Sequence, residues 1–422
     1  MRIAIIGAGN VGKTLGQGWA GAGHEIVYGA REGGGPAPHA GSRVDSVQGA
    51  TAAGDVVVLT TPWDAVPDAV AAAGDFAGKP LIDVTNPIGP GFALTLGHHT
   101  SGAERVASLA KNARVVKAFN TTGLENMANP RYGDARAMMP IAGDDRGAVD
   151  VAVRLASDLG FEPFALPVLA RARELEPLAM LWIKLALQWG MGRGFALAVG
   201  RRSPAERMPD VPKTKQPRAI TVVGSGNIGG ALARAWLSAG HAVTIAAKDP
   251  AEPGVQALVA LGAKAVPVAG AAAGAEIVAL ATPASVAGEV ARELGRLEGT
   301  IVVDCTNAIA KGFALEHGHT TSSSEELAKG LGGARVVRAF NQQGAEVLRN
   351  PLFGGRPAAC FVASDDADAR FVVRGLAADV GLDGIEAGPL SSARLLEPMT
   401  LVWIAMAQTI GTRDFGFCVL RR

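Results

Sequence analysis

Two glycine-rich loops have the residue types and the spacing of phosphate-binding turns. They are Gly7-Ala8-Gly9-Asn10-Val11-Gly12 and Gly224-Ser225-Gly226-Asn227-Ile228-Gly229, and each follows an apolar run and opens a helical pattern. In this context the first glycine permits a tight turn, the second lets the backbone approach a pyrophosphate, and the third lets helix and strand pack closely. Free N–H groups at the helix start bind phosphate, so both loops predict dinucleotide binding. The alternative is that the glycines only make a close turn.

The end of the second expected strand indicates which nicotinamide cofactor binds. An NAD-binding unit usually has an acid there for the ribose hydroxyls, whereas a 2′-phosphate needs space and a cation. The first copy reads VYGAR, with Ala30 in place of the acid and Arg31 after it, and this pattern favours NADP. The alternative is that Arg31 is a solvated loop charge beside Glu32. The second copy reads IAAKD, where Lys248 lacks the bidentate fork of arginine.

Polar loops also follow three later apolar runs, at the edge where open α/β sheets bind ligands. Their amide and hydroxyl groups can bind a nicotinamide carboxamide without adding charge. Trp63 either shelters a flat ring or is a half-buried packing residue. The candidate binding residues are Thr60, Thr61, Pro62, Trp63, Asn86 and Asn120 in the first copy and Thr282 and Asn307 in the second.

The sequence assigns no catalytic side chain and no metal ligand, because it contains no recognisable Ser/His/Asp or Cys/His motif. His98 and His319 lie just before the capping-box signals Ser101-x-x-Glu104 and Ser322-x-x-Glu325. A role at the entry to a helix is therefore favoured over metal binding.

An internal repeat sets the domain organisation. LIDVTNPIGPGFAL from Leu81 matches VVDCTNAIAKGFAL from Val302, and ARVVKAFNTTG from Ala113 matches ARVVRAFNQQG from Ala334. The match continues to the ends of both copies. The sequence thus predicts two domains, residues 1–202 and 218–422, joined by a proline-rich linker at residues 203–217.

Apolar runs alternate with helical patterns inside each copy. RIAII, DVVVLT, PLIDVT and RVVKAF are continuous rather than alternating apolar runs. Such runs indicate strands that are buried on both faces of a parallel sheet. The expected fold class is α/β, with two Rossmann-like doubly wound parallel sheets, each followed by a small helical C-terminal segment.

The composition excludes some partners. Forty Lys and Arg against 39 Asp and Glu give a net charge of +1, which provides no field to recruit nucleic acid or an anionic membrane. The most apolar segment, from Leu178, is interrupted by Lys184 and Gln188 and is expected to be a buried helix rather than a membrane span. Widely spaced cysteines and an N-terminus that enters a strand pattern directly favour a cytoplasmic protein.

Several motifs together resemble the family of NADP-dependent oxidoreductases that reduce the deazaflavin coenzyme F-420. These motifs are GAGNVG, YGAR, TTPW, KAFNT, AGDD and ELEPLAML, and the resemblance covers nearly the whole of each copy. It implies that the residues from Gly7 to Gly12, with Ala30 and Arg31, hold NADPH. It also implies that the TPW loop and the terminal helices shape the site where the deazaflavin meets the nicotinamide.

The sequence departs from that family in two ways. Family members are usually a single unit that acts as a dimer, whereas this chain carries two. The serine that commonly precedes the arginine is Ala30 here. The second copy departs further, with Ala284 in place of Trp63 and with Lys248 and Asp249 near the phosphate site.

We therefore expect a cytoplasmic NADPH-dependent oxidoreductase whose small-molecule acceptor is coenzyme F-420 or a flavin. The alternatives are a non-catalytic NADPH-binding or redox-sensing protein and a reductase of another small acceptor. The first copy is expected to catalyse the reaction, and the second is expected to serve mostly as an interface. The apolar terminal segments around Trp182 and Trp403 are expected to pack on each other as an internal pseudo-dimer, with further homo-oligomerisation left open.

Overall fold

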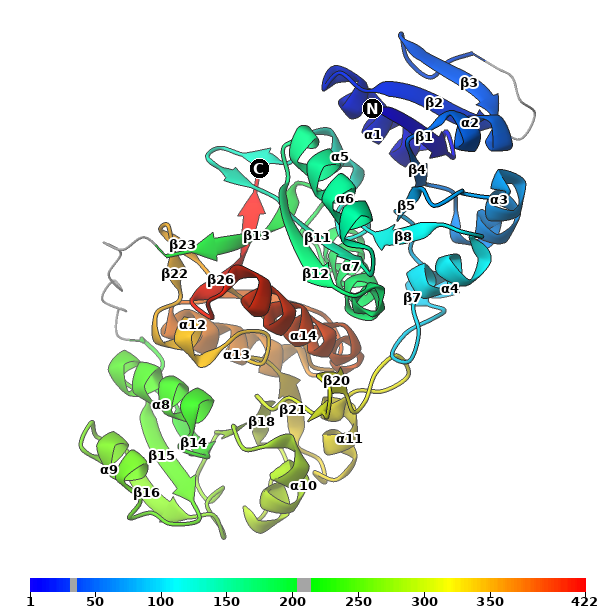
Figure 1. Cartoon of the computed structure of the whole chain (residues 1–422). Coiled ribbons are helices and arrows are strands. Elements are labelled where there is room, and N and C mark those ends of the chain that lie inside the picture. Colours follow the sequence, from blue (N-terminus) through cyan, green and yellow to red (C-terminus); the bar gives the residue numbers. More distant parts are fainter. Residues whose placement is uncertain (31–35, 203–213) are drawn as a thin grey trace. The chain divides into compact units, whose positions relative to one another are not determined.

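The computed structural model describes residues 1–30, 36–202 and 214–422, which form two compact units (Figure 1). The first unit comprises Met1–Ala198 together with Ile404–Ile410 and Val419–Arg422. The second comprises the described residues of Val199–Trp403 together with Gly411–Cys418. The first unit thus takes some residues from the C-terminal end of the chain. Residues 203–213, most of the predicted linker, lie outside the described residues.

The first unit is built on an eight-stranded sheet. All neighbouring strands run parallel except β11 and β8, which are antiparallel. In spatial order the strands are β12 (Glu162–Pro167), β11 (Met138–Gly143), β8 (Arg114–Lys117), β5 (Pro80–Asp83), β4 (Val56–Leu59), β1 (Arg2–Ile6), β2 (Glu25–Ala30) and β3 (Ser42–Ser46). The helices are α1 (Asn10–Gly21), α2 (Val47–Ala53), α3 (Val66–Ala73), α4 (Gly102–Leu109), α5 (Leu124–Ala128), α6 (Arg146–Leu159) and α7 (Ala172–Leu187).

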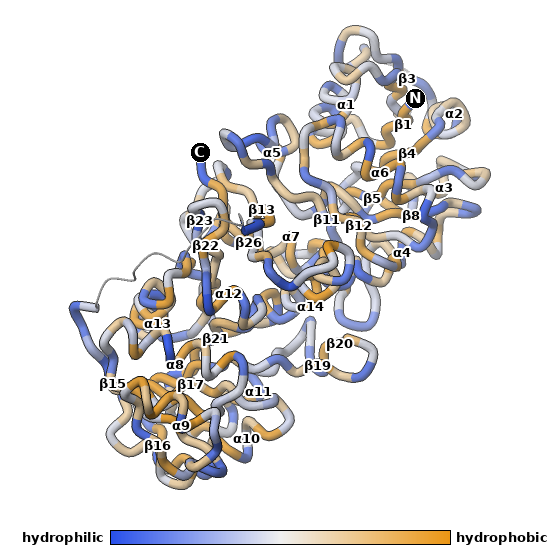
Figure 2. The backbone as a smooth tube through the Cα atoms, turned by 60° about the vertical axis from the view of Figure 1, so that its left-hand side comes forward, coloured by the Kyte–Doolittle hydropathy of each residue, from blue (hydrophilic) through white to orange (hydrophobic). Residues whose placement is uncertain are grey.

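Helices cover both faces of this sheet, which explains the continuous apolar runs. Ile3 and Ile5 of β1 pack in one core with residues of α1 and α6. The intervening Ala4 and Ile6 pack in a second core with residues of α2, α3 and α4. Successive side chains of a strand point to opposite faces, so both must be apolar when both are covered. Figure 2 shows this hydrophobic colouring along β1 and, in the second unit, around β15.

The second unit repeats the arrangement with a six-stranded, fully parallel sheet. Its strands are, in spatial order, β16 (Lys264–Pro267), β15 (Ala242–Ala247), β14 (Ala219–Val223), β17 (Ile277–Leu280), β18 (Ile301–Asp304) and β21 (Arg335–Arg338). A separate parallel pair consists of β24 (Ala359–Val362) and β25 (Asp383–Glu386). The helices are α8 (Asn227–Ala239), α9 (Pro253–Val259), α10 (Ala284–Glu293), α11 (Ser323–Lys329), α12 (Ala345–Arg349), α13 (Ala367–Val380) and α14 (Ala393–Ile410). The predicted α/β class with two Rossmann-like sheets is confirmed.

The terminal segment of each copy contains a strand as well as the expected helix. After α7 and α14 the chain forms β13 (Phe195–Arg201) and β26 (Phe415–Arg421), where the sequence predicted only a small helical segment. The side chains of both strands are largely buried, which favours extended structure for these short apolar runs. Trp182 stacks on Phe195 and Trp403 stacks on Phe415, each with ring centroids 5.3 Å apart. Each tail strand is therefore anchored to the helix that precedes it.

The internal repeat extends to individual contacts. Trp19 Nε1 donates to Leu155 O at 3.0 Å, and Trp236 Nε1 donates to Leu376 O at 3.2 Å, so the same buried hydrogen bond joins α1 to α6 and α8 to α13. Both predicted capping boxes are also confirmed: the Ser101 and Ser322 hydroxyls accept from the backbone N–H three residues later, at the starts of α4 and α11. Among the helices of the described ranges, none has the length and apolar character needed to cross a bilayer.

Candidate functional site

The first glycine loop joins β1 to α1 and is shaped for a pyrophosphate. Gly7 has φ +111°, a left-handed conformation that side chains disfavour. A Cβ atom on Gly12 would lie 2.0 Å from Gly7 O, so helix and strand approach too closely for any other residue. Gly9, in contrast, faces open space, since a Cβ there would meet nothing within 4 Å. The loop tip from Ala8 to Asn10 is exposed, and Val11 is half-buried.

The second loop has the same geometry between β14 and α8. Gly224 has φ +100°, a Cβ on Gly229 would lie 2.0 Å from Gly224 O, and one on Gly226 would meet nothing within 4 Å. Ser225 and Ile228 are half-buried, and Asn227, which is exposed, accepts a hydrogen bond from Arg349.

Both loops fit a dinucleotide pyrophosphate. Gly9 and Gly226 are the N-caps of α1 and α8, and neither helix has a capping side chain or an acidic residue in its first turn. The first N–H groups of each helix therefore keep their hydrogen-bonding capacity for an anion, which the helix dipole also favours. The open space at Gly9 and Gly226 lets a phosphate approach the backbone.

Thr60 and Trp63 extend the first site beyond the glycine loop. The Thr60 hydroxyl, just after β4, donates to Gly7 O at 2.7 Å and so fixes the turn. Pro62 caps a short 3₁₀ helix, Trp63–Ala65, and Trp63 is half-buried against the core. A Cβ atom on Gly102, the first residue of α4, would lie 3.2 Å from the Trp63 ring. In the second unit Ala281 and Ala284 occupy the positions of Thr60 and Trp63, so neither contact is available there.

The residues predicted to distinguish NADP from NAD are only partly described. Ala30 is the last residue of β2 and is half-buried. Arg31 lies outside the described residues. Lys248 follows β15 and is exposed.

Asn86 and Asn120 form a reciprocal amide pair at the carboxyl ends of β5 and β8. Asn86 Nδ2 donates to Asn120 O, and Asn120 Nδ2 donates to Asn86 Oδ1, both at 3.1 Å. Asn120 Nδ2 also donates to Leu175 O of α7 at 3.2 Å. Asn120 Oδ1 is buried and accepts no hydrogen bond from the described residues. Because a buried acceptor without a donor is destabilising, this atom is a candidate ligand contact.

The residue before Asn120 has an unusual backbone. Phe119 has φ +61°, and its equivalent Phe340 has the same value. A bulky residue in this region is strained, and strain of this kind is held where the surrounding structure enforces it, often at functional sites. The same backbone conformation precedes the paired asparagine in both copies.

A buried ion cluster supports the amide pair. Lys117 Nζ lies 2.9 Å from Asp83 Oδ2 and 2.9 Å from Glu176 Oε1, and it donates to Thr85 O, the neighbour of Asn86. The side chains of Lys117 and Asp83 are 0% exposed and that of Glu176 is 1% exposed. Glu176 also accepts from the backbone N–H groups of Gly102 and Ala103 at the start of α4. The cluster therefore ties β5, β8, α4 and α7 together.

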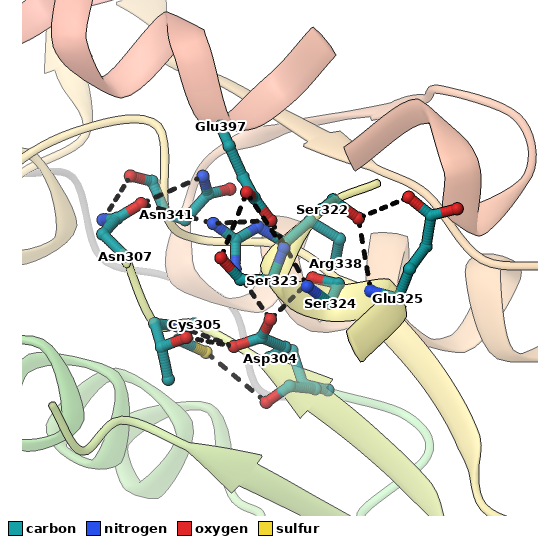
Figure 3. Close-up of polar contacts among 12 residues, drawn as sticks. Asp304, Cys305, Asn307, Ser322, Ser323, Ser324, Glu325, Arg338, Asn341 and Glu397 are labelled. Atoms are coloured by element: carbon teal, nitrogen blue, oxygen red, sulfur yellow. Dashed lines mark hydrogen bonds and ion pairs between the residues drawn. The ribbon is translucent and has the colours of Figure 1, made fainter. Parts of the chain in front are cut away.

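The second unit contains the same cluster with arginine in place of lysine (Figure 3). Arg338 NH1 lies 2.7 Å from Asp304 Oδ2, and Arg338 NH2 lies 3.8 Å from Glu397 Oε1. Glu397 accepts from the N–H groups of Ser323 and Ser324 at the start of α11. The longer arginine also reaches Asn307 Oδ1, at 3.3 Å.

The charges in the first unit are set by burial and by their neighbours. Burial acts to lower the pKa of Lys117, but the carboxyl groups of Asp83 and Glu176 outweigh it, so the pKa is raised and the ammonium stays charged. Burial raises the pKa of Glu174 to about 7, although Arg171 opposes the shift. Glu174 directly precedes Leu175, whose carbonyl accepts from Asn120.

Sequence reasoning identified the loops but not the ion cluster. The structure brings the glycine loop, Thr60 and the pair Asn86–Asn120 to neighbouring strand ends of one sheet. The structure assigns no contact to the other two predicted threonines. The hydroxyl oxygens of Thr61 and Thr282 are buried and make no hydrogen bond with the described residues. Searching the same described part of the chain gives no group of three or more His, Cys, Asp or Glu side chains suited to a metal ion.

Both copies of the repeat are similar to known proteins. The family model described as NADP oxidoreductase, coenzyme F-420-dependent, matches twice, over residues 2–87 and 219–308. The metalloreductase STEAP3 of Rattus norvegicus is 31% identical over 188 residues, which are 43% of this chain and 37% of that protein. The chain thus spans little more than a third of the length of this curated relative.

Solved structures with similarity to the chain include three reductase-like or unassigned proteins. A candidate F-420-dependent NADP reductase from an Arthrobacter species is 29% identical, with 47% of this chain and 96% of that chain covered and a TM-score of 0.44. A hypothetical protein of Sinorhizobium meliloti is 30% identical, with 40% and 86% covered and a TM-score of 0.36. A reductive aminase of Aspergillus terreus is 17% identical, with 46% and 63% covered and a TM-score of 0.37.

The family match begins at β1 and ends just beyond Asn86 in the first copy, and it covers the equivalent segment, through Asn307, in the second. It therefore includes both glycine loops and the first partner of each amide pair. Each half of this chain therefore carries a segment that matches the model of the coenzyme F-420-dependent NADP oxidoreductase family.

Proposed function

We propose that the first unit binds NADPH and transfers hydride to a flat heterocyclic acceptor, with the deazaflavin coenzyme F-420 as the first choice and a flavin as the next. The observation that carries the proposal is the neutral amide pair Asn86–Asn120 beside an ion cluster whose charged groups are paired with one another. Reduction of a carbonyl or an imine ordinarily needs a positioned proton donor. Hydride transfer between two stacked heterocycles depends mainly on holding them in alignment, which neutral hydrogen bonds can do.

Each residue of the first site has a role in this proposal. The first N–H groups of α1 bind the pyrophosphate, and the Thr60 hydroxyl holds the Gly7 carbonyl so that the turn keeps its shape. Asn120 Oδ1 accepts a hydrogen bond from the nicotinamide carboxamide, and Trp63 forms an apolar wall. When bound, NADPH supplies a hydride, and a solvent proton completes the reduced acceptor. Arg31 is the proposed ligand of the 2′-phosphate.

The family match supports the choice of acceptor, since the matching family is described by its dependence on coenzyme F-420. The similarity to a protein named as a metalloreductase supports a second candidate, ferric ion reduced by way of a flavin. A third candidate is a protein that binds NADPH as a redox sensor and does not turn it over. The duplication is proposed to reproduce a homodimer within one chain.

A purified-protein assay separates these candidates. The full chain is mixed with NADPH and, in separate reactions, coenzyme F-420, FMN or ferric citrate, and NADPH oxidation is followed by absorbance. We expect turnover with coenzyme F-420 to exceed that with FMN or ferric citrate. Turnover with ferric citrate only when FMN is added identifies the metalloreductase. Tight NADPH binding by calorimetry without turnover on any acceptor identifies the sensor and contradicts the proposal.

Matched glycine variants identify the working site. Gly9→Leu places a side chain where the pyrophosphate approaches in the first unit, and Gly226→Leu does the same in the second. Both positions have ordinary negative φ and open space, so neither change strains the loop itself. We expect Gly9→Leu to abolish coenzyme F-420 reduction and Gly226→Leu to retain most of it. The reverse result assigns turnover to the second unit.

A further inference from the structure

We infer that the two units treat the nicotinamide end of a dinucleotide differently: the amide pair of the first unit is open to a carboxamide, whereas that of the second is closed by its own neighbours. The second unit then binds the ADP portion of the cofactor through its intact glycine loop and gains nothing from the nicotinamide. This inference rests on the proposed function, in that the first unit is taken to bind NADP(H), and it adds an ADP site in the second unit.

The open state is defined by Asn120. This residue is buried, with 4% of its surface exposed. Its Oδ1 atom accepts no hydrogen bond from residues 1–30, 36–202 and 214–422. Both hydrogens of its amide nitrogen are used, on Asn86 Oδ1 and Leu175 O. The remaining capacity is therefore one acceptor, which matches the N–H donors of a primary carboxamide.

The equivalent acceptor in the second unit is already occupied. Gln342 Nε2 donates to Asn341 Oδ1 at 2.5 Å and also to Phe361 O at 3.2 Å. In the first unit the residue after Asn120 is Thr121, which is too short to make this bond. A carboxamide that approaches Asn341 meets an acceptor that already has a donor, so it gains less there than at Asn120, where it would satisfy an orphaned acceptor.

The partner asparagine of the second unit is also engaged. Asn307 Oδ1 accepts from Asn341 Nδ2 at 3.3 Å and from Arg338 NH2 at 3.3 Å. The Thr400 hydroxyl lies 3.1 Å from the same oxygen and shares its one hydrogen with Asn341 O, at 2.9 Å. The first unit has Ala179 where the second has Thr400, and Lys117, whose contacts are Asp83, Thr85 and Glu176, where the second has Arg338.

Three residue differences thus distinguish the two units around an asparagine pair that both contain. They are Thr121 against Gln342, Ala179 against Thr400, and Lys117 against Arg338. None of them touches the glycine loops, whose geometry is the same in both units. Loss of discrimination at the nicotinamide end is therefore separable from loss of pyrophosphate binding.

Calorimetric titration of the full chain tests the inference without measuring activity. Gly226→Leu protein reports the first unit and Gly9→Leu protein reports the second, and each is titrated with NADP⁺ and with 2′-phospho-ADP-ribose. The two ligands share the 2′-phosphate, the pyrophosphate and both riboses, so the Kd of 2′-phospho-ADP-ribose divided by the Kd of NADP⁺ depends only on the nicotinamide. We expect Gly226→Leu protein to bind NADP⁺ about tenfold tighter than the truncated ligand, since one hydrogen bond to a buried acceptor is gained. Gly9→Leu protein should bind the two ligands equally.

Equal ratios in the two variants overturn the inference and leave the proposed function standing. Binding by Gly226→Leu protein alone overturns the part that gives the second unit an ADP site. Absence of binding to either variant, with none to the parent protein, removes the proposed function itself.

Reciprocal substitutions provide the second measurement. In the Gly226→Leu background, Thr121→Gln combined with Ala179→Thr should close the first pair and reduce the ratio toward one. In the Gly9→Leu background, Gln342→Thr combined with Thr400→Ala should open the second pair and raise the ratio several-fold. Unchanged affinity for 2′-phospho-ADP-ribose in each variant shows that the unit is folded. If the Kd ratio stays unchanged while the affinity for 2′-phospho-ADP-ribose is retained, these residues do not open or close the asparagine pair.

Discussion

In the first unit the Lys117 ammonium lies 2.9 Å from the Glu176 carboxyl group, and both side chains are shielded from solvent. Removing a cation from such a cluster leaves carboxyl groups buried without compensation, and losses of about 3–5 kcal/mol are typical when one partner is removed. We expect Lys117→Met to lower the free energy of unfolding of the first unit by an amount of this order. Urea denaturation followed by tryptophan fluorescence measures it.

Lys117→Arg is the matched control, because the second unit places Arg338 at the same position beside an aspartate and a glutamate. It should retain most of the stability that Lys117→Met loses. If Lys117→Met unfolds at the urea concentration of the parent protein, the cluster does not stabilise the first unit.

Gly9 and Gly12 of the first loop predict different effects of alanine on stability. A Cβ atom on Gly12 would lie 2.0 Å from Gly7 O, whereas one on Gly9 would meet nothing within 4 Å. Gly12→Ala should therefore displace the backbone, lower the Tm by several degrees and weaken NADPH binding. Gly9→Ala should keep the parent Tm and weaken NADPH binding alone. Differential scanning calorimetry with and without NADPH separates the two effects, and equal Tm values for both variants would contradict the geometry.

Glu174 predicts a specific pH dependence of stability. Its pKa is raised to about 7 in the folded protein from an ordinary value of 4.5, because the side chain is buried. The protonated form is favoured on folding, so its stabilising contribution is fully present below 4.5 and is lost as pH rises through about 7. The shift corresponds to roughly 3 kcal/mol. Relative to the parent, Glu174→Gln should gain stability between about pH 5 and pH 8, as measured by urea denaturation at both values. A constant difference would show that Glu174 titrates normally.

Arg31 predicts the choice between the phosphorylated and unphosphorylated cofactors. The position of an acid that would bind both ribose hydroxyls is taken by Ala30, and arginine makes charge-assisted bonds to phosphate. Loss of such bonds amounts to roughly 1.5–3 kcal/mol, so Arg31→Ala should weaken NADPH binding about tenfold or more and leave NADH binding almost unchanged. Calorimetry in the Gly226→Leu background measures the first unit alone. Equal affinity of the protein with Arg31 for NADPH and NADH would contradict the predicted preference for NADPH.

A fragment of residues 1–202 should not behave as an independent domain. The first unit includes Ile404–Ile410 and Val419–Arg422, which the fragment lacks. Within that unit, Arg422 N–H donates to Gly194 O at 2.9 Å, and the Arg422 guanidinium lies 4.6 Å from the centre of the Tyr132 ring. We expect the fragment to self-associate or aggregate by light scattering. A stable, active monomer would contradict this and the proposed internal dimer.

The sequence predicted the sheets and the glycine loops because their signals are local. Continuous apolar runs such as that from Ile3 to Ile6 require burial on both faces, and a glycine triplet between a strand and a helix has one main geometry. The tail strand from Phe195 was missed because a short apolar run next to a long helix can be read as either structure.

The ion cluster was missed for a different reason. Asp83 and Lys117 each end a strand, and each resembles a solvated loop charge when its segment is read alone. Burial of a charge depends on a partner from elsewhere in the chain, here Glu176 of α7, and no local pattern contains that information. The repeat did offer a signal, because the same three positions keep an acid, a base and an acid in the second copy.

The difference between the amide pairs was also not accessible from sequence. Gln342 and Thr400 are neutral residues that many positions tolerate, and their effect depends on side chains that meet at one point from separate segments. Only the arrangement of donors around Asn341 and Asn307 shows that both acceptors of the second pair are already engaged.

Because Val419–Arg422 belong to the first unit, the order of synthesis and the order of completion are reversed in this protein. The N-terminal half leaves the ribosome first, yet it lacks residues of its own unit that are translated about 200 positions later. At ordinary translation rates it waits for roughly 10 to 40 s while about 200 more residues are made. During this time apolar surface that the finished unit buries is available to chaperones. A nascent chain that stalls in the second half therefore presents an incomplete first domain, which a quality-control protease can recognise.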